Sequence, residues 1–226
     1  NMVQNKKRFV FVGCGEIAYC HADVILSLGH QIIGVAARTK SPTIGLFSKK
    51  YQINYCYDDF HKMFNELQPD AVILCTSWDQ TEKIIEDVIN YDIPVLVEKP
   101  VALSSEKLKN VIEEVGGNSE NVLVGYNRRF YDFVPDLKKA ISEQELLSVQ
   151  LNFPEAISNL KLQFPTIQNY ILFYISSHWL DLVSYLLGQL NVVVMQKKEK
   201  DGFSTSYNGL LKTETGKIPI HYQSNF

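Results

Sequence analysis

The stretch "FYISSHWLDL" (residues 173–182) places a histidine and an aspartate three residues apart, His178 and Asp181. In an α-helix, residues at this spacing share a face, so Tyr174, His178, Asp181 and Tyr185 would form one polar edge. A histidine can take up and release a proton near neutral pH, and a carboxylate beside it can orient the imidazole or bind a substrate hydroxyl. The alternative is that His178 belongs to the core or to an interface.

A second chemical pattern is the glycine run "VFVGCGEIA", in which Gly13, Gly15 and Ala18 follow a strand-like segment and open a helix-like one. Gly13 permits a tight turn, Gly15 lets the backbone approach a pyrophosphate, and Ala18 lets the helix pack closely on the strand. The pattern alone is also compatible with an ordinary turn. Because it begins the first strand–helix–strand unit of the chain, it indicates a dinucleotide-binding loop.

The end of the second strand-like segment, "GVAARTK", bears on which dinucleotide binds. NAD-specific loops place an acid roughly 20 residues after the glycines to bind the ribose 2′-hydroxyl, and Ala37 stands there. Arg38, followed by Thr39, can pair with a 2′-phosphate or stack on adenine. NADP is therefore slightly favoured over NAD, although a stacked arginine also accepts NAD and a solvated loop is the alternative.

The first half of the chain alternates two kinds of segment. Apolar strand-like runs are "RFVFVGCG", "QIIGVAAR", "DAVILCTS", "PVLVEKP" and "NVLVGYN". Helix-like runs between them include "EIAYCHADVILSL", "SPTIGLFSKKY", "DDFHKMFNEL", "QTEKIIEDVINYD" and "SSEKLKNVIEEVGG". This alternation predicts an α/β domain over residues 1–126, a doubly wound parallel sheet of the Rossmann type covered by helices on both faces.

The pattern changes in residues 127–226. "FVPDLKKAISE" is helix-like, "LLSVQLNF" strand-like, and "IQNYILFYISSHWLDLVSYLLG" helix-like with an uncertain start. After residue 191, strand-like runs are separated by the turn signals "KDG" and "ETGK". We therefore expect a C-terminal α+β domain with a mostly antiparallel sheet, for substrate binding or oligomerisation.

Composition excludes several classes of partner. The net charge of -3 and the lack of a basic stripe argue against nucleic acid. Apolar runs are far shorter than the roughly 18 residues that span a bilayer, and no secretory leader is visible. The four cysteines show no metal-ligand spacing, so we expect no metal, reduced thiols and a cytoplasmic protein acting on small molecules.

Three motifs in order resemble the Gfo/Idh/MocA family (glucose–fructose oxidoreductase and inositol 2-dehydrogenase). They are "GCGEIA" with His21 after it, "VLVEKPVALS" (95–104) and "VGYNRRF" (124–130). "ILCTSWDQTEKI" is similar to the family segment after the fourth strand, and the resemblance is strong over residues 8–130 and loose beyond. It implies an NAD(P)-dependent dehydrogenase or reductase acting on a secondary alcohol or ketone of a sugar, cyclitol or sugar derivative, including nucleotide sugars, as a homo-oligomer.

The resemblance also assigns roles. Lys99 would lie beside the nicotinamide and stabilise a developing alkoxide, Glu98 would position Lys99, the Lys99–Pro100 bond would be cis, and His178 would be the acid–base residue. Substrate binding would involve Lys99, Asp181 and Tyr174, whereas Arg129 would be structural or interdomain. The implied cofactor contacts are Gly13, Gly15, Glu16, Ile17, Ala18, Arg38, Thr39, Cys75, Thr76, Ser77, Glu98, Lys99, Asn127 and Arg128.

Two departures leave an alternative open. Tyr174 stands where the family often has an aspartate, so either substrate binding differs or the usual catalytic set is incomplete. The chain is also shorter than usual for the family, which predicts an incomplete second sheet with an exposed edge. The alternative function is a catalytically weak or inactive dinucleotide-binding sensor, or a subunit of a complex.

Overall fold

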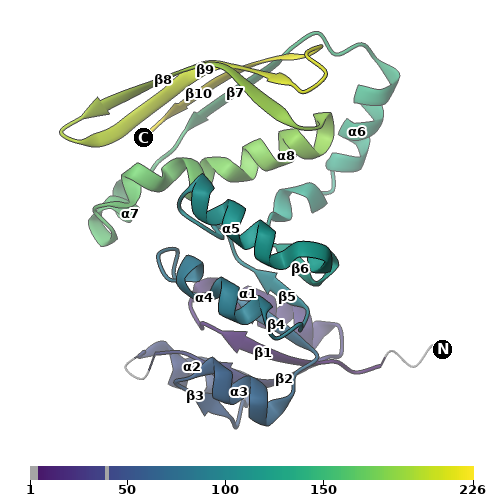
Figure 1. The fold of residues 1–226 in the computed structure, drawn as a ribbon, viewed down its shortest axis with the longest axis vertical. Coiled ribbons are helices and arrows are strands. Elements are labelled where there is room, and N and C mark those ends of the chain that lie inside the picture. Colours follow the sequence, from purple (N-terminus) through teal and green to yellow (C-terminus); the bar gives the residue numbers. More distant parts are fainter. Residues whose placement is uncertain (1–4, 39–40) are drawn as a thin grey trace. The chain divides into compact units, whose positions relative to one another are not determined.

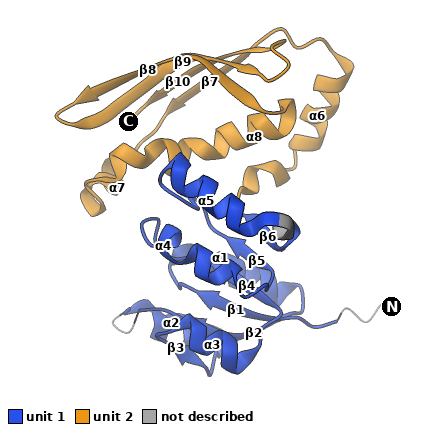
Figure 2. Ribbon diagram, viewed as in Figure 1, with its two compact units in different colours: residues 1–125 blue, residues 126–226 orange. Residues whose placement is uncertain are grey.

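A computed structural model describes residues 5–38 and 41–226 of the chain. The chain divides into two compact units, residues 1–125 and 126–226 (Figure 2). This division lies next to the boundary expected from the sequence, at residue 126. Each unit has its own sheet and its own apolar core.

Unit 1 alternates strands and helices throughout (Figure 1). Its elements are β1 (Arg8–Val12), α1 (Glu16–Ser27), β2 (Gln31–Ala36), α2 (Thr43–Tyr51), β3 (Cys56–Tyr57), α3 (Phe60–Leu67), β4 (Ala71–Leu74), α4 (Thr81–Ile89), β5 (Val95–Val97), α5 (Ser105–Val115), the 3-10 helix η1 (Gly116–Asn121) and β6 (Val122–Val124).

The six strands form one parallel sheet in the order β3-β2-β1-β4-β5-β6. The chain leaves β1 toward β2 on one side and returns to β4 on the other, so the order reverses between β1 and β4. Ligands of doubly wound sheets bind at such a switch point, outside the carboxyl ends of the strands. The predicted Rossmann fold is thus confirmed, and the edge at which β1, β4 and β5 end is the one where such folds generally bind their ligands.

Two apolar clusters cover the faces of this sheet. On one face, α1 and α2 contribute Ala18, Ala22 and Phe47, which pack on β1 and β4. On the other face, α3, α4 and α5 contribute side chains such as Phe64 and Ile85. Strands buried on both faces must be apolar at every position, which explains the continuous apolar runs in the sequence.

Helix ends in unit 1 follow the capping signals of the sequence. The Asp59 carboxylate accepts from the backbone N–H of His61 at 2.8 Å and opens α3. The Ser104 hydroxyl accepts from the N–H of Lys107 at 3.1 Å and opens α5, which ends at Gly116 with φ 51°. Such caps satisfy backbone donors that the helix leaves unpaired, and they fix where each helix begins.

Unit 2 combines helical segments with a second sheet (Figure 1). Its elements are the 3-10 helix η2 (Asn127–Phe130), α6 (Val134–Glu143), β7 (Val149–Pro154), α7 (Ser158–Gln163), the 3-10 helix η3 (Ile167–Tyr170), the π-helical turn η4 (Leu172–Ser176), α8 (Ser177–Leu187), β8 (Leu190–Lys200), β9 (Phe203–Thr213) and β10 (Pro219–Asn225). The sequence did not predict α7.

The second sheet has the order β7-β10-β9-β8. The pairs β8–β9 and β9–β10 are antiparallel, as the turn signals predicted, and β10 pairs with β7 in parallel. Asp201 and Gly202 both have positive φ angles, 53° and 78°, in the tight turn between β8 and β9. The sheet is therefore mixed but mostly antiparallel, which confirms the expected fold class.

The helical stretch before β8 is less regular than expected. The sequence pattern predicted one helix from Ile167 to Gly188, but the α-helical part begins only at Ser177, after the π-turn η4. The Ser177 hydroxyl donates to the carbonyl of Phe173 at 2.6 Å, and such a bond competes with the regular helix ladder. Trp179 and Val183 of α8 pack on the sheet. In the parts of the chain that are described, every helix is too short or too polar to cross a membrane.

Candidate functional site

The glycine loop joins the end of β1 to the start of α1. Gly13 has φ 97°, and a Cβ atom there would lie 2.4 Å from the carbonyl oxygen of Cys75, so only glycine fits. Gly15 caps α1, and a Cβ atom there would meet nothing within 4 Å. The exposed Gly15, Glu16 and Ile17 thus surround an open helix N-terminus, whereas Ala18 is fully buried against the sheet.

The segment after β4 lies beside this loop. The Cys75 thiol donates to the Gly13 carbonyl at 3.3 Å, and Cys75 is only 4% exposed. Burial raises the pKa of this thiol, and the negative charge of Glu98 acts in the same direction. Cys75 is therefore a neutral packing residue. The hydroxyls of Thr76 and Thr81 lie 3.0 Å apart, and the Ser77 carbonyl accepts from the first turn of α4.

The end of β2 carries the residues that were expected to select the nucleotide. Ala37 is half-buried, and Arg38 is exposed to solvent. Thr39 lies outside the described residues. Exposure leaves the Arg38 guanidinium accessible to a ligand at the same edge of the sheet as the glycine loop.

Glu98 is held in place from two sides at the end of β5. Its carboxylate lies 2.7 Å from Nε2 of His21 on α1, and the two side chains are only 14% and 22% exposed. A Cβ atom at Gly125, after β6, would lie 2.9 Å from the Glu98 carboxylate. Sequence reasoning treated His21 as structural by default. The motif "GCGEIA" could have indicated a role for His21, which follows that motif by about one helical turn.

Lys99 follows Glu98 directly and is half-buried at the carboxyl edge of the sheet. The Lys99–Pro100 peptide bond is cis, in agreement with what the resemblance implied. The glycine loop, Thr76, Ser77, Glu98 and Lys99 therefore all follow strands that end at one edge. The structure thus gathers most of the expected cofactor contacts in unit 1.

In unit 2, α8 carries His178 beside the segment that opens this unit. The Tyr126 ring meets the His178 ring edge-on, with centroids 5.8 Å apart and planes at 85°. Burial raises the pKa of Tyr126, while the nearby Ser177 hydroxyl opposes this shift. Tyr174 is half-buried in the π-turn before α8. Of the residues expected on one polar edge, His178 is thus packed against Tyr126.

Asp181 of α8 forms an ion pair with Arg129. Nε of Arg129 donates to one carboxylate oxygen at 2.7 Å, and a terminal nitrogen donates to the other. The Asp181 side chain is 10% exposed. This bidentate geometry is the strong form of an arginine–carboxylate contact, and it raises the pKa of Arg129.

The neighbouring Arg128 of η2 also packs against α8. Its guanidinium carbon is 3.5 Å from the centroid of the Trp179 ring, and Trp179 in turn stacks on Phe153 of β7. Asn127, between Tyr126 and Arg128, is exposed. Of the two residues of this segment expected to contact the cofactor, Arg128 is therefore held by a stacking contact in unit 2, and Asn127 is open to solvent.

A buried polar cluster at the end of β7 was missed from sequence. The hydroxyl of Ser176, fully buried, donates to the Glu155 carboxylate at 3.5 Å. Burial raises the pKa of Glu155, while the positive charge of Arg128 opposes this shift. Tyr222 and Ser224 of β10 are buried nearby. No local motif marks Glu155, because its partners come from distant parts of the chain.

Glu155→Gln should therefore stabilise the protein at neutral pH. A raised pKa favours the protonated carboxyl in the folded state, and this contribution is lost as pH rises through that pKa. Glutamine imitates the protonated form and does not titrate. We expect the variant to unfold at a higher temperature than wild type at about pH 8, with a smaller difference at about pH 5.

Thermal unfolding across this pH range checks the prediction. Glu145→Gln, at an exposed glutamate of the same unit, is the matched control and should show no such gain. Equal or lower stability of Glu155→Gln at the alkaline end would contradict the assigned environment.

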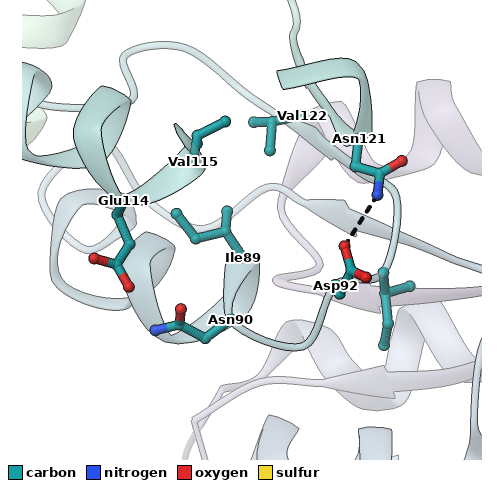
Figure 3. A pocket seen from close by; sticks show the side chains of 8 residues that line it. Ile89, Asn90, Asp92, Glu114, Val115, Asn121 and Val122 are labelled. Carbon is teal, nitrogen blue, oxygen red and sulfur yellow. Dashed lines mark hydrogen bonds between the residues drawn. The ribbon is translucent and has the colours of Figure 1, made fainter. Parts of the chain in front are cut away.

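A separate hollow lies at the opposite edge of the unit 1 sheet, where strands begin (Figure 3). It measures about 130 Å³ and is lined by residues such as Asn90, Glu114 and Asn121. Asn121 donates to the Asp92 carboxylate at 3.2 Å across its rim. The hollow is remote from the glycine loop, because the loop follows the carboxyl end of a strand.

Within residues 5–38 and 41–226, no three His, Cys, Asp or Glu side chains gather closely enough to hold a metal ion.

Curated relatives cover much of this chain but extend well beyond it. The uncharacterized oxidoreductase YrbE of Bacillus subtilis is 21% identical over 218 residues, which are 94% of this chain and 63% of YrbE. The inositol 2-dehydrogenase of Rhizobium meliloti is 27% identical over 94% of this chain and 67% of that enzyme. The myo-inositol 2-dehydrogenase of Thermotoga maritima is 22% identical over 80% of this chain, and the match covers 55% of that enzyme. The chain thus spans less than two thirds of YrbE and of the Thermotoga enzyme.

Solved structures share the fold over most of the chain. A putative NADPH-dependent oxidoreductase from Desulfitobacterium hafniense superposes with a TM-score of 0.82 at 21% identity, covering 98% of this chain and 67% of that one. The WlbA dehydrogenase from Bordetella pertussis, solved with NADH and UDP-GlcNAcA, superposes with a TM-score of 0.79 at 18% identity. The match covers 96% of this chain and 71% of that one. At such identities the likeness shows the architecture.

Residues 7–126 match the model of the "Oxidoreductase family, NAD-binding Rossmann fold" (GFO_IDH_MocA). These residues contain the glycine loop, the His21–Glu98 contact and the segment Glu98–Pro100. They make up more than half of the 226 residues. The chain belongs to the Gfo/Idh/MocA oxidoreductase family.

Proposed function

We propose that this chain binds NAD(P) through unit 1 and takes part in hydride transfer to or from a secondary alcohol or ketone of a sugar, cyclitol or sugar derivative. The observation that carries the proposal is the placement of the glycine loop and Lys99 at one edge of the sheet. Family membership supports the redox class. The inositol dehydrogenases among the relatives, and the WlbA structure with UDP-GlcNAcA, support the substrate class.

The loop fits a dinucleotide. The position of a Cβ atom at Gly15 is open space, and the first turn of α1 is exposed there. The backbone can therefore approach a pyrophosphate, and the unpaired N–H groups of the helix start can bind its oxygens. The close packing at Gly13 and Ala18 holds the loop in this shape.

The chain must manage a proton when a secondary alcohol is oxidised. A bound nicotinamide would supply the hydride acceptor. In the proposal, the Lys99 ammonium lies at the substrate hydroxyl and stabilises the developing alkoxide, which lowers the barrier to losing the proton. Glu98, fixed by His21, orients the strand end that carries Lys99. His178 is proposed as the acid–base residue that unit 2 contributes.

Arg38 is proposed to favour NADP. A guanidinium bound to a 2′-phosphate forms charge-assisted hydrogen bonds worth about 1.5–3 kcal/mol. We therefore expect Arg38→Ala to weaken NADPH binding by roughly 10- to 100-fold while changing NADH affinity little. Titrations of both nucleotides on both proteins check this.

The control for Arg38 is Lys49→Ala, which removes an exposed positive charge on α2. It should leave both affinities unchanged. If NADH binds much more tightly than NADPH to the wild-type chain, or if Arg38→Ala weakens the two nucleotides equally, the NADP preference is wrong.

A turnover screen tests the proposed reaction. Nicotinamide absorbance is followed with cyclitols, free sugars and nucleotide sugars in the oxidising direction, and with the corresponding ketones in reverse. The proposal predicts turnover for at least one class. Nucleotide binding without turnover on any of them would favour the alternative of a sensor or complex subunit, for which Tyr174 in place of an aspartate is the supporting observation.

A further inference from the structure

Asp181 was expected to orient His178 or to bind a substrate hydroxyl, but its environment points elsewhere. Both of its carboxylate oxygens accept hydrogen bonds from Arg129, at the start of unit 2. The carboxylate is 90% shielded from solvent, since its side chain is 10% exposed. A carboxylate engaged at both oxygens by one guanidinium has its charge largely compensated.

The same pair fastens the segment Tyr126–Phe130 to α8. Arg129 lies over the Tyr185 ring, with 5.4 Å from its guanidinium carbon to the ring centroid, and Arg128 stacks on Trp179. Tyr126 meets His178 from the same segment. The side chains that cover the His178 side of α8 thus come from the segment that Arg129 anchors.

Within unit 2, several charged and titratable groups lie around α8. The segment Tyr126–Phe130 contributes Tyr126, Arg128 and Arg129, and α8 contributes Asp181 and Tyr185. From α6, Lys138 lies 4.7 Å from the centroid of Tyr185. After β7, Glu155 faces Arg128. Asp181 is one helical turn beyond His178, so a released carboxylate could reach the imidazole.

We propose that Arg129 is a positioning residue that binds Asp181 and withholds its carboxylate from His178, so that Asp181 anchors the segment Tyr126–Phe130 rather than a substrate. The inference rests on the proposed function only in that His178 is the acid–base group. It assigns to Asp181 a role different from the one its spacing suggested.

The experiment is a pH titration of the His178 ring by NMR, without cofactor or substrate. Wild type is compared with Arg129→Gln, Asp181→Asn and the double variant. His21, His30, His61 and His221 serve as internal controls in every sample. The titration measures no turnover, so it can fail independently of the proposed function. The proposed function is tested separately by the turnover screen.

The three variants have distinct expected results. Arg129→Gln raises the titration midpoint of His178 by about 0.5–1 unit, because a positive charge disappears and the released carboxylate can accept from the imidazolium. Asp181→Asn lowers the midpoint, because the Arg129 charge is then uncompensated. The double variant stays within about 0.2 unit of wild type, because two compensating charges leave together.

The double variant shows whether Asp181 is paired with Arg129 or directly with His178. If Asp181 is the direct partner of His178, removing both residues lowers the midpoint by about 1 unit, and the proposal is overturned. An unchanged midpoint in Arg129→Gln overturns it as well. Should Arg129→Gln fail to fold, Arg129→Lys is measured in its place. It keeps the positive charge and should leave the His178 midpoint near the wild-type value. The double variant still shows whether Asp181 is the partner of Arg129 or of His178.

Discussion

Lys99→Met is expected to lower kcat by about 10²–10⁴-fold with little change in nucleotide affinity, because a positioned proton-transfer group contributes that much to a rate. Methionine keeps much of the length and apolar character of the side chain but removes the ammonium. A group that acts on the developing alkoxide is needed in the transition state, so the loss falls on kcat.

Steady-state kinetics on the substrate found in the screen measure this effect, with a nucleotide titration beside it. Lys109→Met, at an exposed lysine of α5, is the matched control and should retain wild-type rates. If Lys99→Met keeps more than about a tenth of the wild-type kcat, Lys99 has no such role.

Gly13→Ala is expected to destabilise unit 1 by about 3 kcal/mol or more. A residue with a side chain is strained at φ 97°, and its Cβ atom would lie 2.4 Å from the backbone oxygen of Cys75. Neither the end of β1 nor the segment after β4 can move away without breaking strand pairing. Chemical unfolding followed by circular dichroism measures the loss.

Gly15→Ala forms the matched pair. Its Cβ atom enters open space at a φ of −74°, so stability should change little. Nucleotide affinity should nevertheless fall by at least about 10-fold, because the methyl group occupies the approach of the pyrophosphate to the backbone. A Gly13→Ala protein as stable as wild type, or a Gly15→Ala protein with unchanged affinity, contradicts the assigned loop geometry.

The fold of unit 1 and its glycine loop were largely predictable because their signals are local. Gly13, Gly15 and Ala18 lie within six consecutive residues. A buried parallel strand is indicated by an unbroken apolar run. The shortest strand, β3 (Cys56–Tyr57), has too few residues to give any pattern. The parallel pairing of β10 with β7 was also out of reach, because pairing partners far apart in sequence leave no periodic signal.

The second unit shows where spacing stops being informative. The interval between His178 and Asp181 correctly placed both on one helix, but the partner of Asp181 is Arg129, 52 residues away. The same holds for Glu98 and His21, separated by 77 residues. The surroundings of Glu155 likewise combine Ser176 of η4 and Tyr222 of β10. Such contacts arise only when the chain is folded, so the sequence indicates which residues can react but not which are already engaged.

Dinucleotide binding by unit 1 is tested by titrating the wild-type chain with NADH and NADPH and following nicotinamide fluorescence. We expect saturable binding of at least one nucleotide with a Kd below about 1 mM, weakened in Gly15→Ala. If a chain that is folded by circular dichroism binds neither nucleotide in this range, the sheet edge formed by the glycine loop and Lys99 is not a dinucleotide site.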